Sequence, residues 1–578
     1  MSQSSPAKKH STSHYFLEGL NEIGVEYLFS NFGTDHAPLI EEMARWDKEG
    51  RKFPATILCP HENTAMHMAA GYAMVTGKGQ AVMVHVDAGT SNTAMGMHNA
   101  RRCHTPLLLM AGKAPYTVRG ELPGSRDNYV HFVQEPFDQG SIVRNYAKWE
   151  WTLPSGVITK EVLRRAHSVA HSDPQGPTYL MLPRETLAQE WDEAQVASFP
   201  AEQYGPARAG AAAGSDVTQI VDRLLSAKYP VLITSYAGRV SEAPATIEAL
   251  ALFGGIRVIE AHAAYLNINR KSPAFAGFMP GRHVVEADVG LMVDVDVPWI
   301  PKETRTNPNT WWAHVDIDIA KNDFPLWGFS TNLRIGGDAN TVLQQVLVEL
   351  KARATPAFKA AAAERLAAMQ KEQAEREALN AKLASDKGVK DGINPHYVAA
   401  EVARHLGEDD IIVNEAVRNT LVVLNQVTRT KPGTSLGFAG GGLGCSPGMA
   451  LGAKLARPKA TVVQFVGDGG FYFGNPSSVY AVAQQYNTPI FTVLFDNSGW
   501  QAVKEATLRM YPEGDAKGRS SFQARLAPKM QFAKVCEAAG GHGETVTDPA
   551  EVAGAVERCI KAVRAGQAAV MHVRIPSI

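Results

Sequence analysis

Short apolar runs alternate with amphipathic stretches over the first third of the chain. Between residues 14 and 190 the runs are typical of β-strands, while Ser13–Gly24 and Glu62–Thr76 have the spacing of helices. The strands expected in this unit are Val25–Phe29, Ala55–Leu58, Ala81–His85, Leu107–Ala111 and Thr178–Leu182. Strands that alternate with helices predict a parallel sheet covered on both faces.

The same alternation returns twice more. Residues 191–215 include a stretch rich in Ala, Gly and Pro and predict a linker to a central unit at 216–353. Residues 354–390 are dense in Ala, Glu, Lys and Gln, which predicts a long surface helix leading to a third unit at 391–578. Further strands are expected at Val231–Thr234, Arg257–Glu260, Val289–Val293, Trp312–Asp316, Ile411–Asn414, Thr461–Val466, Ile490–Asp496 and Ala568–Arg574. The expected fold is therefore α/β, with three doubly wound parallel-sheet domains, and the similar size of the outer two suggests an old duplication.

Charge and cysteine content narrow the function. With 57 basic and 58 acidic side chains the net charge is −1, which gives no electrostatic reason to expect nucleic acid or a membrane surface as a partner. No run of about 20 uncharged apolar residues predicts a membrane span. The five cysteines are scattered without a CxxC pair, so we expect neither a disulfide framework nor a zinc site, and a cytoplasmic location. The polar residues 1–13 predict a disordered tail.

The strongest local motif is Gly467-Asp468-Gly469-Gly470, directly after an expected strand. Asn497 follows 29 residues later, at the end of the next expected strand, with Gly499 behind it. Because ligands of open parallel sheets bind at the carboxyl ends of the strands, we expect Asp468 and Asn497 at one edge. A carboxylate, an amide oxygen and a backbone carbonyl are ligands that Mg²⁺ accepts together with phosphate oxygens. A tight strand-to-helix turn without a ligand would also explain the glycines alone.

A second motif lies about 400 residues upstream, at Cys59-Pro60-His61-Glu62. It follows an expected strand and opens a helix. Taken alone, Glu62 is an acidic residue in a first helical turn, where the helix dipole favours it.

Together, and in this order, the two motifs resemble those of thiamine diphosphate-dependent enzymes, in the branch of the benzoylformate decarboxylases and acetolactate synthases. The resemblance covers nearly the whole chain. It implies a pyrimidine-binding domain at 14–190, a central domain, and a diphosphate-binding domain at 391–578. It also implies that Glu62 hydrogen bonds the pyrimidine ring and activates the cofactor, and that Asp468, Asn497 and the Gly499 carbonyl bind Mg²⁺. The residues implied to contact the cofactor are Glu62, Asn414, Val417, Arg418, Asn419, Gly441, Leu443, Gly467, Asp468, Gly469, Gly470, Asn497 and Gly499.

The stretch from His85 to Leu107 is similar to benzoylformate decarboxylase. The resemblance implies that His85 is a pocket histidine that moves protons, and that Thr34 lies near the substrate carboxylate. Asp35 and His36 are further ionisable candidates beside Thr34. A histidine bonded only to backbone is the alternative for His85.

The expected reaction is decarboxylation of a small 2-oxo acid, with or without ligation to a second carbonyl. An acetolactate synthase-type transferase is the main alternative, since Asp294–Pro301 and Gly499–Lys504 are closer to those proteins. A catalytically silent relative is disfavoured because Glu62, Asp468 and Asn497 are all present. The flavin-binding stretch of the true synthases is not recognisable, so FAD is not expected. The family further implies a homodimer or homotetramer with active sites at the subunit interface.

Overall fold

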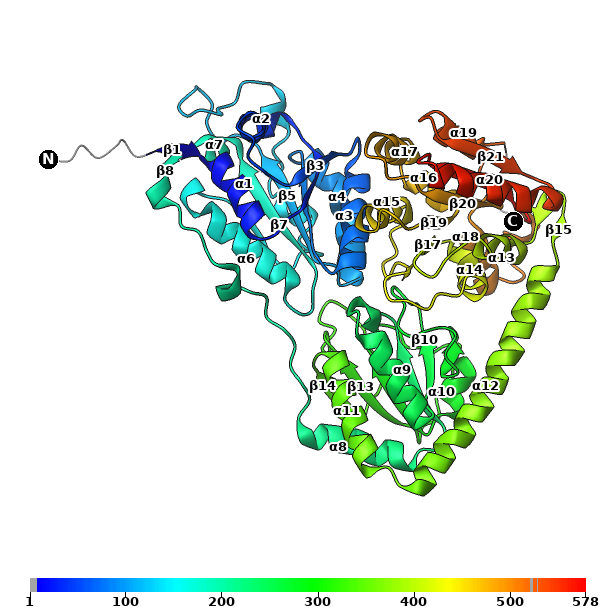
Figure 1. Ribbon diagram of the computed structural model, residues 1–578. Coiled ribbons are helices and arrows are strands. Elements are labelled where there is room, and N and C mark those ends of the chain that lie inside the picture. Colours follow the sequence, from blue (N-terminus) through cyan, green and yellow to red (C-terminus); the bar gives the residue numbers. More distant parts are fainter. Residues whose placement is uncertain (1–7, 520–522, 528) are drawn as a thin grey trace. The chain divides into compact units, whose positions relative to one another are not determined.

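The computed structural model describes residues 8–519, 523–527 and 529–578. The chain divides into two compact units. The first holds the N-terminal sheet together with Gly440–Pro458 and Phe473–Thr488, and the second holds the central and C-terminal sheets. Each of the three sheets has six strands, and every strand pair in them is parallel (Figure 1). The expectation of three doubly wound parallel-sheet domains is confirmed.

The N-terminal sheet has the strand order β3-β2-β4-β5-β7-β6. Its strands are β2 (Tyr27–Asn31), β3 (Ala55–Leu58), β4 (Ala81–Val84), β5 (Leu107–Lys113), β6 (Glu150–Thr152) and β7 (Pro177–Pro183). Its helices are α1 (Thr12–Glu22), α2 (Ala37–Lys48), α3 (Glu62–Thr76), α4 (Ala88–Arg102), α5 (Val130–Val133), α6 (Thr159–His171) and α7 (Arg184–Ala188). Side chains alternate between the faces of a strand, and both faces are buried here: Leu28 packs with α1 and α6, and the next residue, Phe29, is buried on the other side.

Part of the stretch that the sequence assigned to a disordered tail forms secondary structure. Residues 1–7 lie outside the described residues, but Lys9–Ser11 form β1, which pairs antiparallel with β8 (Glu190–Asp192), and α1 begins at Thr12. The expectation of disorder up to residue 13 is therefore wrong for this part. Its polar residues are used locally, because the Ser11 hydroxyl caps α1 and donates to Glu42.

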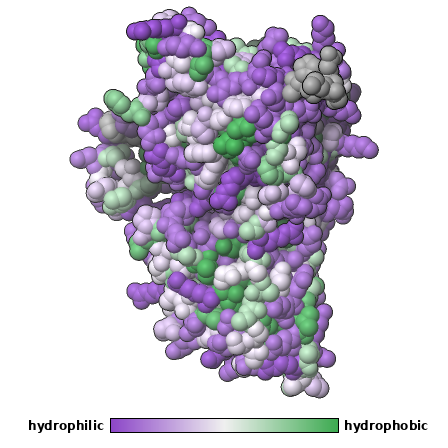
Figure 2. Space-filling model, turned by 90° about the vertical axis from the view of Figure 1, so that its left-hand side faces the viewer, coloured by the Kyte–Doolittle hydropathy of each residue, from purple (hydrophilic) through white to green (hydrophobic). Residues whose placement is uncertain are grey.

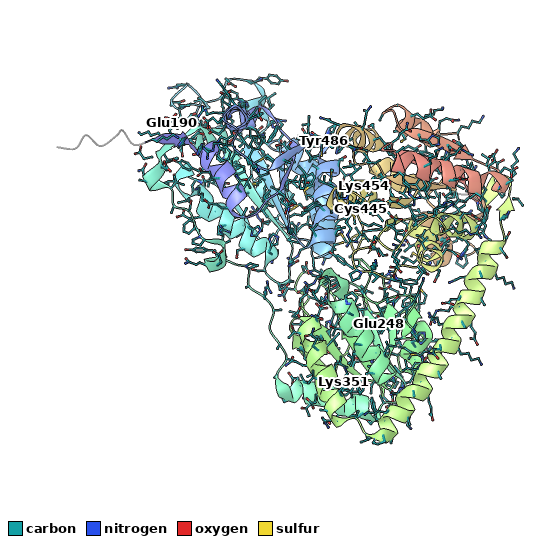
Figure 3. The ribbon with its side chains drawn as sticks, viewed as in Figure 1. Glu190, Glu248, Lys351, Cys445, Lys454 and Tyr486 are labelled. Atoms are coloured by element: carbon teal, nitrogen blue, oxygen red, sulfur yellow. The ribbon has the colours of Figure 1, made fainter. Side chains whose placement is uncertain are left out.

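Two helices that follow much later in the chain complete the first unit, α15 (Ser446–Ala456) and α17 (Pro476–Gln485). Helix α15, with Cys445 and Lys454 near its two ends in Figure 3, packs on α3 through glycine. A Cβ at Gly452 would lie 2.7 Å from the Tyr72 nitrogen, so only glycine allows this approach. Tyr486 follows α17, and its hydroxyl accepts the Leu58 N–H at 2.7 Å (Figure 3). These contacts fix the strand that precedes α3.

The central sheet has the order β11-β10-β9-β12-β13-β14, which is the dinucleotide-fold order. Its elements are α8 (Gly214–Ser226), β9 (Pro230–Thr234), α9 (Ala243–Gly254), β10 (Arg257–Glu260), β11 (Phe275–Gly277), α10 (Gly281–Glu286), β12 (Val289–Val293), β13 (Trp311–Asp316), β14 (Leu333–Gly336), α11 (Ala339–Arg353) and α12 (Pro356–Ser385). The long α12 matches the helix predicted from composition.

The C-terminal sheet has the order β18-β17-β19-β20-β22-β21. Its strands are β17 (Ile411–Glu415), β18 (Ser435–Leu436), β19 (Val462–Gly467), β20 (Phe491–Asp496), β21 (His542–Val546) and β22 (Ala569–Arg574), and its helices are α13 (Pro395–Ala403), α14 (Thr420–Gln426), α16 (Asp468–Phe473), α18 (Gln501–Met510), α19 (Phe532–Glu537) and α20 (Val552–Arg564). Numbered within its own domain, each outer sheet has the order 2-1-3-4-6-5. The shared order supports the suggested duplication.

Within the described residues, no helix is both long and apolar enough to span a bilayer. On the face drawn in Figure 2, hydrophilic residues predominate and hydrophobic residues form small separate patches. All five cysteines are buried, and none forms a disulfide bond.

A buried ionic network lies at the carboxyl ends of the central strands. Lys321 is fully buried, and its ammonium group donates to Asp296 at 2.7 Å and to the Tyr236 hydroxyl at 2.6 Å, and ion-pairs with Asp316 at 2.9 Å. His314 adds a contact to Asp316 at 3.1 Å. Burial alone would lower the pKa of Lys321, but the two carboxylates hold it above its usual value.

Substitution of this lysine tests how far the central domain depends on the network. We expect Lys321→Met to lower the free energy of unfolding by about 3–5 kcal/mol, because it leaves Asp316 buried without its cation. Hydrogen exchange of β12 and β13 amides, measured in increasing urea, reports this domain separately. Lys359→Met removes an exposed lysine of α12 and should change stability by under about 0.5 kcal/mol. Equal stability of the two variants would contradict the role of the network.

Candidate active site

The first group of predicted site residues surrounds the turns after β19 and β20. Asp468 follows β19 directly, and its carboxylate accepts the N–H of Gly469 at 2.8 Å and the N–H of Gly499 at 3.0 Å. The same Gly499 N–H donates to the Asn497 side-chain oxygen at 3.1 Å. The structure thus brings Asp468, Asn497 and Gly499 together at the carboxyl ends of β19 and β20, on one edge of the sheet, as the sequence predicts.

The turn itself explains the residue types. Ser498 has φ of 60°, a left-handed conformation, and a Cβ at Gly499 would overlap both the Ile578 side chain and the Ala524 carbonyl. The Asn497 amide nitrogen donates to Gln501 at 3.0 Å. This bond fixes which end of the amide carries the oxygen that faces Asp468 and Gly499.

A second carboxylate lies behind the first. The Asp496 carboxylate accepts a hydrogen bond from His572 Nε2 at 2.6 Å and forms an ion pair with Arg574 at 2.8 Å. Burial alone would raise the pKa of Asp496, but these two partners hold it below its usual value. Burial and then the charge of Asp496 raise the pKa of Asp468 to about 7. A nearby cation would keep Asp468 ionised, so the donor set fits a divalent metal ion with oxygen ligands.

The glycines beside Asp468 differ in what a side chain at each position would meet. A Cβ at Gly469 would overlap the ring of Trp500, and one at Gly470 would lie 3.3 Å from the Glu415 carboxylate. At Gly467 the nearest atom, the Phe495 carbonyl, would be 4.0 Å from such a Cβ. Gly469 is therefore needed for packing, whereas Gly467 borders open space.

The loop after β17 is braced by its own residues. The Asn414 side chain accepts from Ala416 at 3.1 Å and donates to the Thr420 carbonyl at 3.1 Å. Val417, Arg418 and Asn419 form the 3₁₀ turn η7 (Val417–Asn419), and Arg418 ion-pairs with Glu505 of α18 at 2.5 Å. These side chains position the loop, and their contact with a cofactor stays a prediction.

The second group lies in the other compact unit. Glu62 is the first residue of α3, capped by His61, and is buried. Its carboxylate accepts the Asn92 amide at 2.9 Å. A Cβ at Gly89 would lie 3.2 Å from His85 Cβ and 3.5 Å from the Glu62 carboxylate, so both side chains flank the same glycine. The structure therefore brings Glu62 and His85 together.

The predicted glycine loop belongs to this unit as well. The N–H of Gly441 donates to His98 at 3.1 Å, and Asn99 makes two hydrogen bonds to the backbone of Gly442, at 2.9 and 3.2 Å. Both partners lie on α4. Leu443 is half-buried beside these contacts, and a Cβ at Gly441 would meet no atom within 4 Å. The loop is thus held rigid with an open edge at Gly441.

Thr34 and His85 lie just beyond the carboxyl ends of two neighbouring strands, β2 and β4. Thr34 begins the 3₁₀ turn η1 (Thr34–His36) beyond β2, and His85 directly follows β4. The strand order reverses between β2 and β4, so both residues lie at the switch point of the sheet. His85 donates through Nδ1 to Asp35 in a short hydrogen bond, and Thr34 is 3.2 Å from His131. A histidine bonded only to backbone is ruled out for His85.

Several of these partners were not identified from sequence. Asp35 is noted there only as an ionisable candidate, and His131, Asn92, Asp496 and His572 are not among the predicted site residues. Asp496 carries one signal, its position directly before Asn497 at a strand end, and Asn92 carries another, its place in the stretch His85 to Leu107. His131 carries none, because it reaches Thr34 from α5, about 100 residues further along the chain.

Comparisons with known proteins agree with this geometry. Residues 10–142 match the family described as thiamine pyrophosphate enzyme, N-terminal TPP binding domain, and residues 419–573 match the corresponding C-terminal TPP binding domain. The acetolactate synthase large subunit of Lactococcus lactis is 25% identical over 520 residues, 88% of this chain and 84% of that protein. Benzoylformate decarboxylase of Pseudomonas aeruginosa is 24% identical over 513 residues, 86% of this chain and 87% of that protein.

Among solved structures, the thiamine diphosphate-dependent 4-hydroxybenzoylformate decarboxylase of Rhodococcus jostii superposes with a TM-score of 0.78. It is 21% identical and covers 98% of this chain and 100% of its own. Benzoylformate decarboxylase of Polynucleobacter necessarius gives 0.77 at 18% identity, covering 98% and 99%. These two likenesses concern the fold.

Proposed function

We propose that this chain, which belongs to the thiamine pyrophosphate-dependent enzymes of the decarboxylase and acetolactate synthase branch, decarboxylates a small 2-oxo acid in a magnesium-dependent site. Asp468, Asn497 and the Gly499 carbonyl would hold Mg²⁺, and Glu62 would activate the cofactor. The observation that carries the proposal is the convergence of the Asp468 and Asn497 oxygens on one backbone N–H. Such preformed oxygen ligands need little rearrangement to coordinate an ion.

The cofactor, when bound, supplies the nucleophilic carbon and the electron sink for the loss of carbon dioxide. The protein supplies the remaining steps. Glu62 would hydrogen bond the pyrimidine ring, while Asn92 holds the Oε2 atom of its carboxylate. Gly467, Gly469 and Gly470 would border the diphosphate, and the loop at Gly441 and Leu443 would support the organic part of the cofactor.

His85 supports decarboxylation with release of an aldehyde. It adjoins Glu62 and is bonded to a carboxylate, which suits a proton donor near neutral pH. Thr34 would receive the substrate carboxylate.

The alternative is an acetolactate synthase-type transferase, and one contact favours it. Trp500 packs over Gly469, where it could shape a pocket for a second carbonyl compound. A catalytically silent relative is disfavoured, because Glu62, Asp468 and Asn497 are all present with ordered partners.

The assembly completes the proposal. Glu62 and Asp468 of one active site would come from different subunits of a homodimer or homotetramer, which we expect in the cytoplasm.

A substrate panel tests the reaction directly. With thiamine diphosphate and Mg²⁺ added, we expect the protein to release carbon dioxide from at least one of pyruvate, branched 2-oxo acids and benzoylformate. Acetolactate, detected by the acetoin colour assay, would identify the transferase instead. Sulfoacetaldehyde belongs in the panel because a sulfoacetaldehyde acetyltransferase of Castellaniella defragrans is 23% identical over 576 residues. If the protein turns over none of these compounds, the proposal is contradicted.

The role of Glu62 predicts a separation of binding from turnover. Glu62→Gln keeps the shape of the side chain but removes its acid–base capacity, so the rate should fall at least about 10²-fold while the cofactor still binds. Steady-state rates and calorimetry measure the two effects. Glu41→Gln, on the exposed face of α2, is the matched control and should leave both unchanged. Full activity of Glu62→Gln would rule out the assignment.

Loss of the proposed metal ligand Asp468 should instead weaken binding of the cofactor itself. Asp468→Ala should abolish the Mg²⁺-dependent part of thiamine diphosphate binding, because a ligand of the ion is lost. Calorimetric titration with and without Mg²⁺ measures this part alone. Asp515→Ala removes an exposed carboxylate and should bind as tightly as the unaltered protein. An unchanged affinity of Asp468→Ala would count against the site.

A further inference from the structure

Asp35 is buried in a space that two glycines keep open. A Cβ at Gly112, in β5, would overlap the Asp35 carboxylate, and one at Gly33 would overlap the His85 ring and lie 2.6 Å from Asp35 Oδ1. Asp35 is wholly buried. Its Oδ2 accepts the N–H of Val86 at 3.2 Å, so the carboxylate is held at both oxygens. The backbone therefore forms a close-fitting site for this pair of side chains.

Two histidines adjoin Asp35, and only one can carry its balancing charge. His36 lies 3.5 Å away, but its Nδ1 accepts the Gly33 N–H at 3.0 Å and so bears no proton there. Burial lowers the pKa of His36. Burial also opposes protonation of His85, but the hydrogen bond and charge of Asp35 raise the pKa of His85 above its usual value. Of the two histidines, His85 is therefore the one whose charged form Asp35 favours.

The other ionisable groups near His85 are consistent with the positive charge lying on His85 and not on His36. Glu62, at the start of α3, adds negative charge near His85. His131, in α5, has a lowered pKa caused first by burial and next by Arg184, and its Nδ1 accepts the Asp127 N–H at 3.4 Å. A neutral ring with that acceptor has its proton on Nε2, which then donates to the Thr34 hydroxyl. The Thr34 hydroxyl hydrogen is left for another acceptor.

We propose that Asp35 is a positioning residue that holds His85 as an imidazolium through Nδ1, so that His85 Nε2–H is the proton donor of this active site. The proton passes from Nε2 to the substrate carbon that has lost carbon dioxide. The ring is left neutral with its hydrogen on Nδ1, facing Asp35, and Nε2 regains a proton from water. This assignment rests on the proposed function, and it adds a specific reason for aldehyde release. His131 orients the Thr34 hydroxyl through the hydrogen bond from its Nε2.

The charge state of His85 can be measured without any turnover. In the cofactor-free protein with ¹⁵N-labelled histidine, assigned with His85→Gln, NMR titration should give a midpoint for His85 above that of an unperturbed histidine side chain. Asp35→Asn keeps the shape and an acceptor but removes the charge, so the midpoint should move to lower pH. Asp87→Asn removes a carboxylate two residues from His85, at a φ of 52° that Asn accepts, and should move it far less. A midpoint in the unaltered protein at or below that of an unperturbed histidine side chain would overturn the proposal, as would one unmoved by Asp35→Asn.

Kinetics then test the donor role. A lower pKa moves the alkaline limb of the kcat profile to lower pH, so kcat of Asp35→Asn should fall about tenfold or more at pH 8 and less at pH 6, because the protonated fraction declines tenfold per pH unit above the pKa. KM should change less than kcat. An NMR shift with an unmoved kcat profile would overturn the donor role. If the unaltered protein turns over no 2-oxo acid, the proposed function fails, while the titration still decides whether Asp35 charges His85.

Discussion

A buried carboxylate is stable only when a partner balances its charge, and this constraint recurs at the strand ends of all three sheets. Asp35 has His85, Asp316 has Lys321, and Asp496 has His572 and Arg574. Asp468 differs. In the described part of the chain its polar contacts are the N–H groups of Gly469 and Gly499 and the carboxylate of Asp496. The Mg²⁺ ion of the proposed function would supply there the balancing cation that the other pairs contain.

The strand orders explain why these carboxylates occupy corresponding places. In the outer sheets the order reverses between the first and third strands, and in the central sheet between the first and fourth. Helices leave such a point toward opposite faces, so the strand ends border a crevice. In the N-terminal sheet this point holds Thr34 and His85, and in the C-terminal sheet it holds Asp468. In the central sheet Tyr236, Asp316 and Lys321 fill the corresponding place with protein side chains.

The sequence predicted the inner strands and only one of the six edge strands of the three large sheets, β3. The strands β6, β11, β14, β18 and β21 were not expected, and each is an edge strand of its sheet. Inner strands of a parallel sheet are buried on both faces and read as apolar runs, whereas an edge strand such as Glu150–Thr152 is short and partly exposed. The bounds of α3 were predicted correctly because His61 caps it and Gly77 ends it in a left-handed conformation. For the candidate site, motifs identified Glu62 and Asp468, but not contacts between distant segments such as Thr34 with His131.

The outcome of the reaction depends on a competition for one substrate carbon. Release of an aldehyde needs a proton at that carbon, while ligation needs a second carbonyl compound to arrive there first. A donor fixed beside the site acts at a high effective concentration, whereas a second substrate must enter and orient before it reacts. Asp35 holds the ring of His85 through Nδ1, and under the proposed role it also keeps that ring charged, so both requirements for rapid protonation would be met within the protein. If His85 is the donor, the Asp35–His85 pair at the ends of β2 and β4 would favour decarboxylation over ligation more directly than any residue proposed to bind the cofactor.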